Sequence, residues 1–155
     1  MKLLAVFFAL GFGQVAYSQV ADTLRYCITE RSIGVGGYDP VSYFQGRKPL
    51  PGIEKFNAVF ERVTYQFSSE ANREKFVSNP TKYLPQFGGW CSMTLAMGRA
   101  TTPKYDNFTI IKGKLYLFER TISVNGRELW LMDPKTNEKV ASNNYTLYRD
   151  TGKIK

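Results

Sequence analysis

The stretch from Val63 to Gly98 constrains the fold most strongly, because strand and helix signals follow one another within it. Apolar residues alternate with polar ones from Val63 to Phe67, which predicts a strand with one buried face. Ser69 then offers a hydroxyl that suits a helix N-cap. The residue before Pro80 is pushed out of the α region, so a helix is expected to end there. The pattern therefore predicts a helix from Glu70 to Ser78.

Two more helix signals follow in the same stretch. Asn79 precedes Pro80, which is typical of a capped helix with proline at its first position, and Pro85 ends that helix. The paired glycines Gly88 and Gly89 permit a sharp turn into a third helix. This helix is expected to carry Cys91 near its N-terminus.

Strands are expected on both sides of this helical stretch. Alternating residues from Phe56 to Phe60 predict a strand that pairs with Val63 to Phe67. Further strands are expected at Leu24 to Ile28, Phe108 to Ile111, Leu115 to Phe118, Ile122 to Val124, Leu129 to Leu131 and Val140 to Tyr148. Asn125-Gly126 is the strongest short hairpin signal in the chain. The predicted fold class is α+β, an antiparallel β-sheet built from hairpins with a small inserted cluster of short helices.

Two groups of residues in the chain share a characteristic order. They read Gly37-Tyr38-Asp39-Pro40-Val41-x-Tyr43-Phe44 and, further on, Tyr65-x-Phe67-Ser68-Ser69, Phe76, Asn79-Pro80-x-x-Tyr83 and Pro85-Gln86-x-Gly88-Gly89-x-Cys91. This order resembles the YHS domain family in its exported bacterial branch, over about residues 36 to 118. The resemblance implies a single framework domain, and it does not imply a settled biochemical role.

The metal-associated members of that family carry two cysteines after the tyrosine and phenylalanine. This chain resembles them in order but has Ser68 and Ala71 at those positions, and it contains no histidine. A hydroxyl and a methyl group do not replace thiolate for a soft or borderline ion. No zinc, copper or other cofactor is therefore predicted.

The N-terminus reads as a secretory signal peptide over residues 1–18. Lys2 precedes an apolar run, and Ala16 and Ser18 have the spacing of a cleavage site. The expected organisation is a leader at 19–35, one YHS-like domain at 36–148 and a basic tail at 149–155. We expect a periplasmic or extracellular protein with no transmembrane segment in the mature chain.

The formal charge of +8 raises the question of nucleic acid. The lysines and arginines are spread along the chain without a run of three and without a recognition motif, which excludes a nucleic-acid binder. The basic surplus fits a surface that adheres weakly to anionic polymers or lipid headgroups. The expected partner is an unknown small ligand or an envelope protein.

Cys27 and Cys91 are the only cysteines. An oxidising compartment allows one disulfide between them, but two free, partly buried thiols are favoured over it. A thiol at a helix N-terminus also has a stabilised thiolate, which would make Cys91 a nucleophile or a soft-metal ligand. Burial without chemistry is the simpler reading, because cysteine is among the most often buried residues.

Aromatic and polar residues gather around the two family segments. The candidate ligand-binding residues are Tyr38, Asp39, Tyr83, Gln86, Trp90 and Cys91. Aromatic side chains with polar tips suit a concave ligand site, although most such residues belong to a core. Asn107 and Asn144 each fit the N-glycosylation pattern, which matters only in a eukaryotic secreted protein.

Two functions remain after these exclusions. The first is a non-catalytic ligand- or partner-binding module, because catalytic histidine pairs and nucleotide loops are missing while the framework motifs are intact. The second is a thiol-dependent protein, redox-active or binding copper through Cys91 with Cys27 or with Met93 and Met97. The first is the prediction, and enzymatic activity is not expected.

Overall fold

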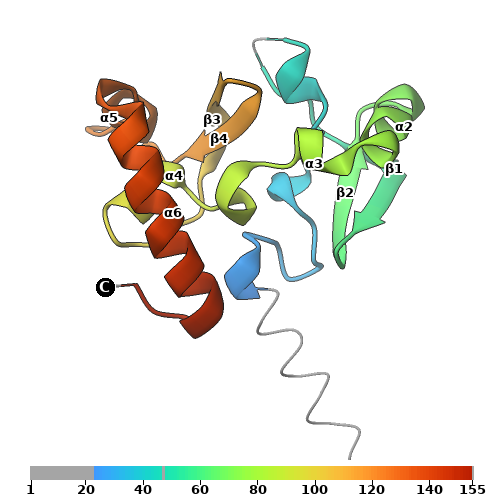
Figure 1. Cartoon of the computed structure of the whole chain (residues 1–155). Helices are drawn as coiled ribbons and strands as arrows, with labels where there is room; N and C mark the ends of the chain where they lie inside the picture. The colour runs from blue at the N-terminus through green and yellow to red at the C-terminus, as the bar shows by residue number, and fades with distance from the viewer. Residues whose placement is uncertain (1–22, 47, 155) are drawn as a thin grey trace, which may run out of the picture.

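Two β-hairpins on opposite sides of the molecule, joined by short helices, organise the structure (Figure 1). This computed structural model describes residues 23–46 and 48–154. The first half contains the 3-10 helices η1 (Val35–Gly37) and η2 (Ser42–Phe44), the strands β1 (Ile53–Phe60) and β2 (Val63–Phe67), and the helices α2 (Glu70–Ser78) and α3 (Pro80–Tyr83). The second half contains η3 (Gln86–Gly89), α4 (Ser92–Ala96), β3 (Lys104–Ile111), β4 (Lys114–Phe118), α5 (Gly126–Met132) and α6 (Pro134–Thr151). The α+β class is confirmed, with two separate two-stranded sheets instead of one.

Helix α2 has the bounds that the sequence predicts. Its N-cap is Ser69, whose Oγ accepts a hydrogen bond from the backbone N–H of Asn72 at 3.2 Å. Pro80 opens α3 at its first turn, as expected. Local capping residues are therefore enough to fix both ends of α2.

The turn between β1 and β2 uses two residues that are not glycine. Glu61 and Arg62 have φ of 48° and 65°, the left-handed values that a tight hairpin of primed type requires. The pairing places Phe60 opposite Val63 and Ala58 opposite Tyr65, so both strands turn the same face to the core. The predicted hairpin is confirmed.

Strand β4 lies between two hydrophobic clusters. Leu115 and Leu117 belong to the cluster built on β2 and α2, whereas Tyr116 and Phe118 belong to the cluster around Trp130. Successive side chains of a strand point to opposite faces, so one strand serves both clusters. All four side chains are buried, and β4 joins the two halves of the molecule.

The predicted hairpin at Asn125-Gly126 is wrong. Asn125 is instead the N-cap of α5, and its Oδ1 accepts hydrogen bonds from the backbone N–H of Arg127 at 3.1 Å and from Asn107 Nδ2 at 2.9 Å. The segments predicted as strands on both sides of the turn are a loop and this helix. Asparagine is as good a helix cap as it is a turn residue, and here the helix forms.

The last predicted strand, Val140 to Tyr148, is also wrong. These residues lie inside α6, the long helix at the left of Figure 1. Asp133 caps it through Oδ1, which accepts from the backbone N–H of Thr136 at 3.1 Å, and Pro134 is its first residue. Of the predicted basic tail, residues 149–151 form the last turn of α6, and Gly152 ends it with φ of 71°.

The expected edge strand from Leu24 to Ile28 is replaced by an irregular segment. Residues 23–25 are helical, and Ile28 makes one isolated bridge to Gly34. Tyr26 and Cys27 are buried, which ties this segment to the body of the protein. The predicted signal peptide and the first residues of the leader lie outside the described part of the chain.

Within residues 23–46 and 48–154, every helix is too short or too polar to cross a bilayer.

Candidate functional site

The two predicted tyrosines lie in packed surroundings. Tyr83 is buried, and its ring meets Phe44 edge-on at 5.5 Å between centroids. Tyr38 is half-buried, bridges Pro51 and lies 6.1 Å from the ring of Tyr105. Both side chains hold the framework around η2 and neither opens into a cavity described below.

Asp39 is a structural carboxylate. It is fully buried and accepts five hydrogen bonds, from the backbone N–H groups of Val41, Ser42 and Ser68, from Ser68 Oγ and from Asn72 Nδ2, at 2.6 to 3.3 Å. Such a set stabilises a buried charge without a cation. Ser68 thus serves this carboxylate, while Ala71 is exposed.

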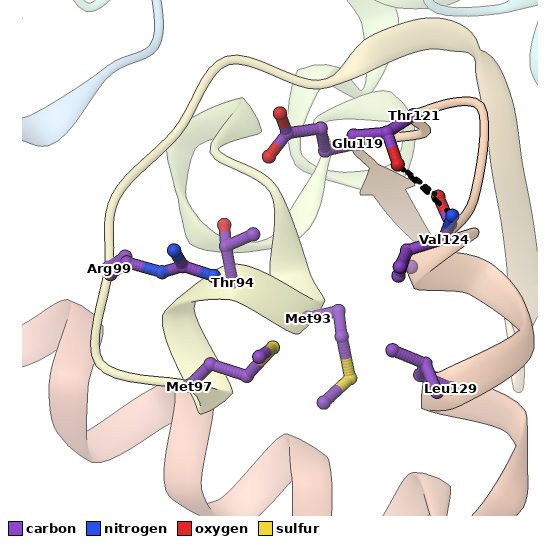
Figure 2. Close-up of a pocket in the computed structure, with 9 residues that line it drawn as sticks. Met93, Thr94, Met97, Arg99, Glu119, Thr121, Val124 and Leu129 are labelled. Carbon is purple, nitrogen blue, oxygen red and sulfur yellow. Dashed lines mark hydrogen bonds between the residues drawn. The ribbon is translucent and has the colours of Figure 1, made fainter.

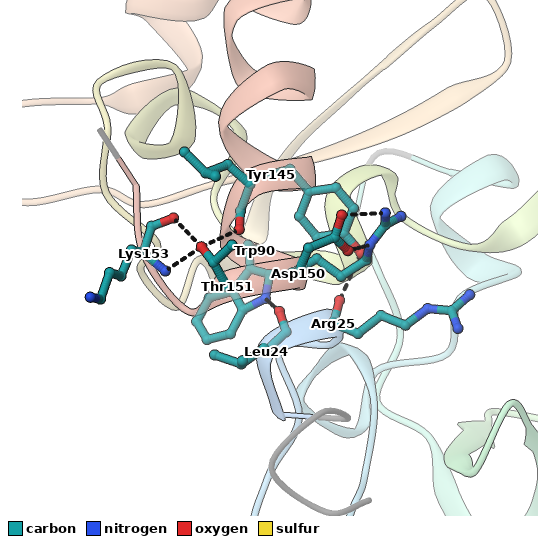
Figure 3. Close-up of polar contacts among 9 residues, drawn as sticks. Leu24, Arg25, Trp90, Tyr145, Asp150, Thr151 and Lys153 are labelled. Carbon is teal, nitrogen blue, oxygen red and sulfur yellow. Dashed lines mark hydrogen bonds and ion pairs between the residues drawn. The ribbon is translucent and has the colours of Figure 1, made fainter. Parts of the chain in front are cut away.

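Trp90 holds the N-terminal segment onto α6. Its Nε1 donates to the carbonyl of Leu24 at 3.1 Å (Figure 3). Its ring meets that of Tyr148 edge-on, with 5.5 Å between centroids. The hydroxyl of Tyr145 donates to the carbonyl of Arg25 at 2.8 Å beside it.

Gln86 is half-buried at the start of η3. Gly88, two residues later, has φ of 61°, and a Cβ added there would lie 1.9 Å from the carbonyl oxygen of Arg25.

The two cysteines are free and buried. Cys27 Sγ lies 3.7 Å from Thr102 Oγ1 and 3.8 Å from the hydroxyl of Tyr105, and burial raises the pKa of this thiol. The thiol of Cys27 therefore stays protonated at neutral pH. A disulfide does not form in this structure, in agreement with the alternative of two free thiols.

Cys91 is the N-cap of α4 and does not lie inside its first turn. Its Sγ accepts hydrogen bonds from the backbone N–H groups of Thr94 at 3.4 Å and of Glu119 at 3.1 Å. The thiol is fully buried. Cys91 thus joins the start of α4 to the end of β4, two segments that are far apart in the sequence.

The cavity that Cys91 supports is the candidate functional site. It has a volume of about 280 Å³ and lies between α4, α5 and the loop after β4 (Figure 2). It is lined by Met93, Thr94, Met97, Arg99, Glu119, Thr121, Val124, Gly126 and Leu129. The two residues that donate to the Cys91 thiol, Thr94 and Glu119, are both in this lining. Cys91 therefore lies outside the lining and holds two residues of the cavity wall in place.

One side of the cavity is charged and the other is apolar. Figure 2 shows Glu119 at the top and Arg99 and Thr94 at the left, with Met97, Met93 and Leu129 along the lower part of the cavity. Small-molecule sites commonly combine apolar walls with a few polar groups that fix the orientation of the ligand. The arrangement suits a small molecule with a charged end and an apolar body.

The guanidinium of Arg99 has no ion-pair or hydrogen-bond partner among the residues that the structure describes. Its backbone N–H is held by the carbonyl of Thr94 at 2.8 Å, so the base of the side chain has a fixed position. Arginine presents several donors in a planar fork that matches a carboxylate. Arg99 therefore provides a free cation at the cavity.

The described residues also form three other cavities. In the cavity of about 300 Å³ beside Pro85 and Gly88, Arg25 is already paired with Glu61 at 2.9 Å. In that of about 320 Å³ beside α6, Glu138 already accepts from Lys114 at 2.7 Å. The largest of the four, about 490 Å³, carries Glu30 and Arg31, but Ile33 is the one aliphatic side chain in its lining, so it has no apolar wall. None of the six predicted ligand-binding residues lines any of the four cavities.

The asparagine side chains of the two glycosylation motifs make hydrogen bonds within the protein. Asn107 is buried and its Nδ2 donates to Asn125, and the Nδ2 of Asn144 donates to the carbonyl of Leu95 at 2.7 Å. These nitrogen atoms are the ones to which a glycan would be attached.

In the described part of the chain, no three His, Cys, Asp or Glu side chains form a group that could hold a metal ion.

Sequence reasoning missed Arg99 and Glu119, the two charged residues of the cavity. It named Met93 and Met97, but only as ligands for a soft metal.

Comparison with protein-family models, with curated proteins and with solved structures finds no match for this chain. The geometry of the cavity is therefore the basis for assigning a function.

Proposed function

We propose that this protein is an exported, YHS-like, non-catalytic domain that binds a small ligand in the cavity between α4 and α5. The ligand carries an anionic group for Arg99 and an apolar body for the wall formed by Met93 and Leu129. The order of residues in the two family segments supports the YHS-like framework. The predicted signal peptide supports a periplasmic or extracellular location.

The observation that carries this proposal is the unpaired guanidinium of Arg99 at the edge of an apolar cavity. Arg99 is exposed at the mouth of the cavity, so its guanidinium is open to a ligand, and Met97 and Thr94 lie beside it in the lining. A charge-assisted bidentate contact made there is stronger than a neutral hydrogen bond. The apolar wall adds affinity in proportion to the area that the ligand covers.

A binding role fits the chemistry of the site better than a catalytic one. The chain has no histidine, and the Cys91 thiol already accepts two backbone hydrogen bonds behind the cavity wall. Nucleophilic catalysis needs a thiol with a neighbouring base and access to substrate. The residues that line the cavity supply recognition.

Titration of the mature protein with L-leucine and with hexanoate, followed by calorimetry, tests the proposal. We expect saturable binding of at least one probe. Arg99→Gln removes the cation with little change of shape and should weaken that binding at least tenfold, because a hydrogen bond to a charged group contributes about 1.5–3 kcal/mol. Arg127→Gln, an exposed arginine of α5 outside the cavity lining, is the matched control and should bind like the parent. Absence of saturable binding, or full affinity in Arg99→Gln, would contradict the proposed site.

Export has a separate test. Lys2 and the apolar run after it predict that the signal peptide is removed after Ser18. Intact mass measurement of the protein from its native host should place Gln19 or a neighbouring residue at the N-terminus. A soluble cytosolic form that retains Met1 is the opposite result, and it would remove the proposed location while leaving the binding site untouched.

A further inference from the structure

We infer that the ligand of this cavity is a zwitterion with an apolar body, of the class of an α-amino acid with an aliphatic side chain. The inference rests on the proposed function, and it adds a second charged contact to it. Arg99 would bind the carboxylate, Glu119 the ammonium group, and Met93 and Leu129 the side chain.

Two opposite charges line the same cavity without pairing with each other. Among the described residues Arg99 and Glu119 form no ion pair. Arg99 is exposed at the mouth of the cavity and Glu119 is half-buried in its wall, so both charges are open to a ligand in the cavity. The ligand that satisfies both at once carries one charge of each sign.

Glu119 is held in place by the surrounding structure. Its Oε2 accepts from Thr101 Oγ1 at 2.9 Å, and its backbone N–H donates to Cys91 Sγ at 3.1 Å. Its carbonyl accepts from the backbone N–H of Gly126 at 3.0 Å. The other carboxylate oxygen, Oε1, accepts no hydrogen bond from the described residues. A fixed carboxylate with one open oxygen is a preorganised acceptor for an ammonium group.

The hydrogen bond from Thr101 to Glu119 is part of a longer chain. Thr101 Oγ1 also lies 2.8 Å from Thr94 Oγ1, and Thr94 Oγ1 donates to the carbonyl of Cys91 at 3.2 Å. Thr94 itself lines the cavity. The carboxylate is thus tied to α4, the helix that carries Met93 and is followed by Met97 as its C-cap. The polar and apolar halves of the site therefore keep a fixed relative position.

The apolar half fits an aliphatic side chain. Met93, Met97, Val124 and Leu129 are flexible or branched aliphatic residues, and no aromatic ring is in the lining. Methionine side chains adapt their shape to different apolar groups. Val124 is fixed by a hydrogen bond from its backbone N–H to Thr121 Oγ1 at 3.0 Å, drawn in Figure 2. A volume of about 280 Å³ leaves room for one small molecule of this kind.

The charges predict how the site selects its ligand. A ligand with a carboxylate but no ammonium group leaves Glu119 unpaired, and its negative charge is repelled by that of Glu119. A ligand with an ammonium group but no carboxylate leaves Arg99 unpaired, and its positive charge is repelled by that of Arg99. Like charges at close range are unfavourable, and a charged group that the ligand covers without pairing loses hydration. Both charged ends of the ligand are therefore needed for full affinity.

Calorimetric titration of the mature protein with three probes tests this inference. L-leucine carries both charges, N-acetyl-L-leucine lacks the ammonium group, and L-leucinamide lacks the carboxylate. We expect L-leucine to bind at least tenfold more tightly than either blocked form. Glu119→Gln should abolish the preference for L-leucine over N-acetyl-L-leucine and keep the preference over L-leucinamide. Arg99→Gln should do the reverse. Glu74→Gln, an exposed glutamate of α2, is the control for Glu119→Gln.

The comparison of probes on the parent protein is decisive even if a variant fails to fold. Equal affinity for L-leucine and N-acetyl-L-leucine would overturn the role of Glu119 and leave the proposed anion site at Arg99 intact. Equal affinity for L-leucine and L-leucinamide would overturn the contact of the carboxylate with Arg99. If none of the three probes nor hexanoate binds, the proposed function and this inference both fail.

Discussion

Asp39→Ala is expected to lower the free energy of unfolding by about 4 kcal/mol or to prevent folding. Removal of the carboxylate leaves buried donors on Ser68, Asn72 and Val41 without an acceptor. Each buried polar group left unsatisfied costs about 1–3 kcal/mol, and the whole stability of a domain is about 5–15 kcal/mol. The measurement is the urea midpoint of the purified variant.

The matched control for this change is Glu74→Ala. Glu74 is an exposed carboxylate of α2, the helix that also supplies Asn72. A surface substitution of this kind usually changes stability by less than about 0.5 kcal/mol. Equal urea midpoints for the two variants would show that the hydrogen bonds of Asp39 do not hold η2 to α2.

The parts of the fold that the sequence predicts well are those with local causes. Helix α2 begins after a capping serine and ends before Asn79-Pro80, and both signals lie within one turn of the helix ends. The first hairpin follows from alternating apolar residues and the second from two short apolar runs, and neither signal needs knowledge of the rest of the chain. Such elements are predictable because short-range sterics and capping decide them.

Helix α6 shows where this reasoning fails. Its inner face has one fully buried apolar residue, Ala141, and the side chains of Asn137, Asn144 and Tyr145 dock the helix by hydrogen bonds to backbone carbonyls. Periodicity of apolar residues cannot reveal such a face. Asp133-Pro134 and Gly152 are a start and a stop signal that were available in the sequence.

The candidate site depends on contacts that are distant in sequence. The backbone N–H of Glu119 reaches the thiol of Cys91, and Thr101 links the same glutamate to α4. Glu119 follows the end of β4 and lies 28 residues after Cys91, the N-cap of α4. No local sequence pattern predicts that these two residues meet. The family segments predicted Cys91 as a site residue, and the structure gives it a positioning role at a cavity formed by other residues.

Phe76→Ala is expected to cost about 3–5 kcal/mol of stability, as truncation of a large core side chain usually does. Phe76 is buried in α2, and its ring centroid lies 5.0 Å from that of Tyr65 and 5.1 Å from that of Phe67. The edge of Phe60 completes the group at 6.4 Å. Loss of the ring leaves a cavity between α2 and both strands of the first hairpin, which rigid strands fill poorly.

Val77→Ala separates this core effect from a simple change of helix propensity. Val77 is the next residue of α2, but its side chain is 55% exposed. Alanine is the better helix former, so this variant should be neutral or slightly more stable. The urea midpoint of Phe76→Ala should therefore fall far below that of Val77→Ala. If the two midpoints agree, α2 does not pack on β2 through Phe76, and the first hydrophobic cluster is built differently from the one described here.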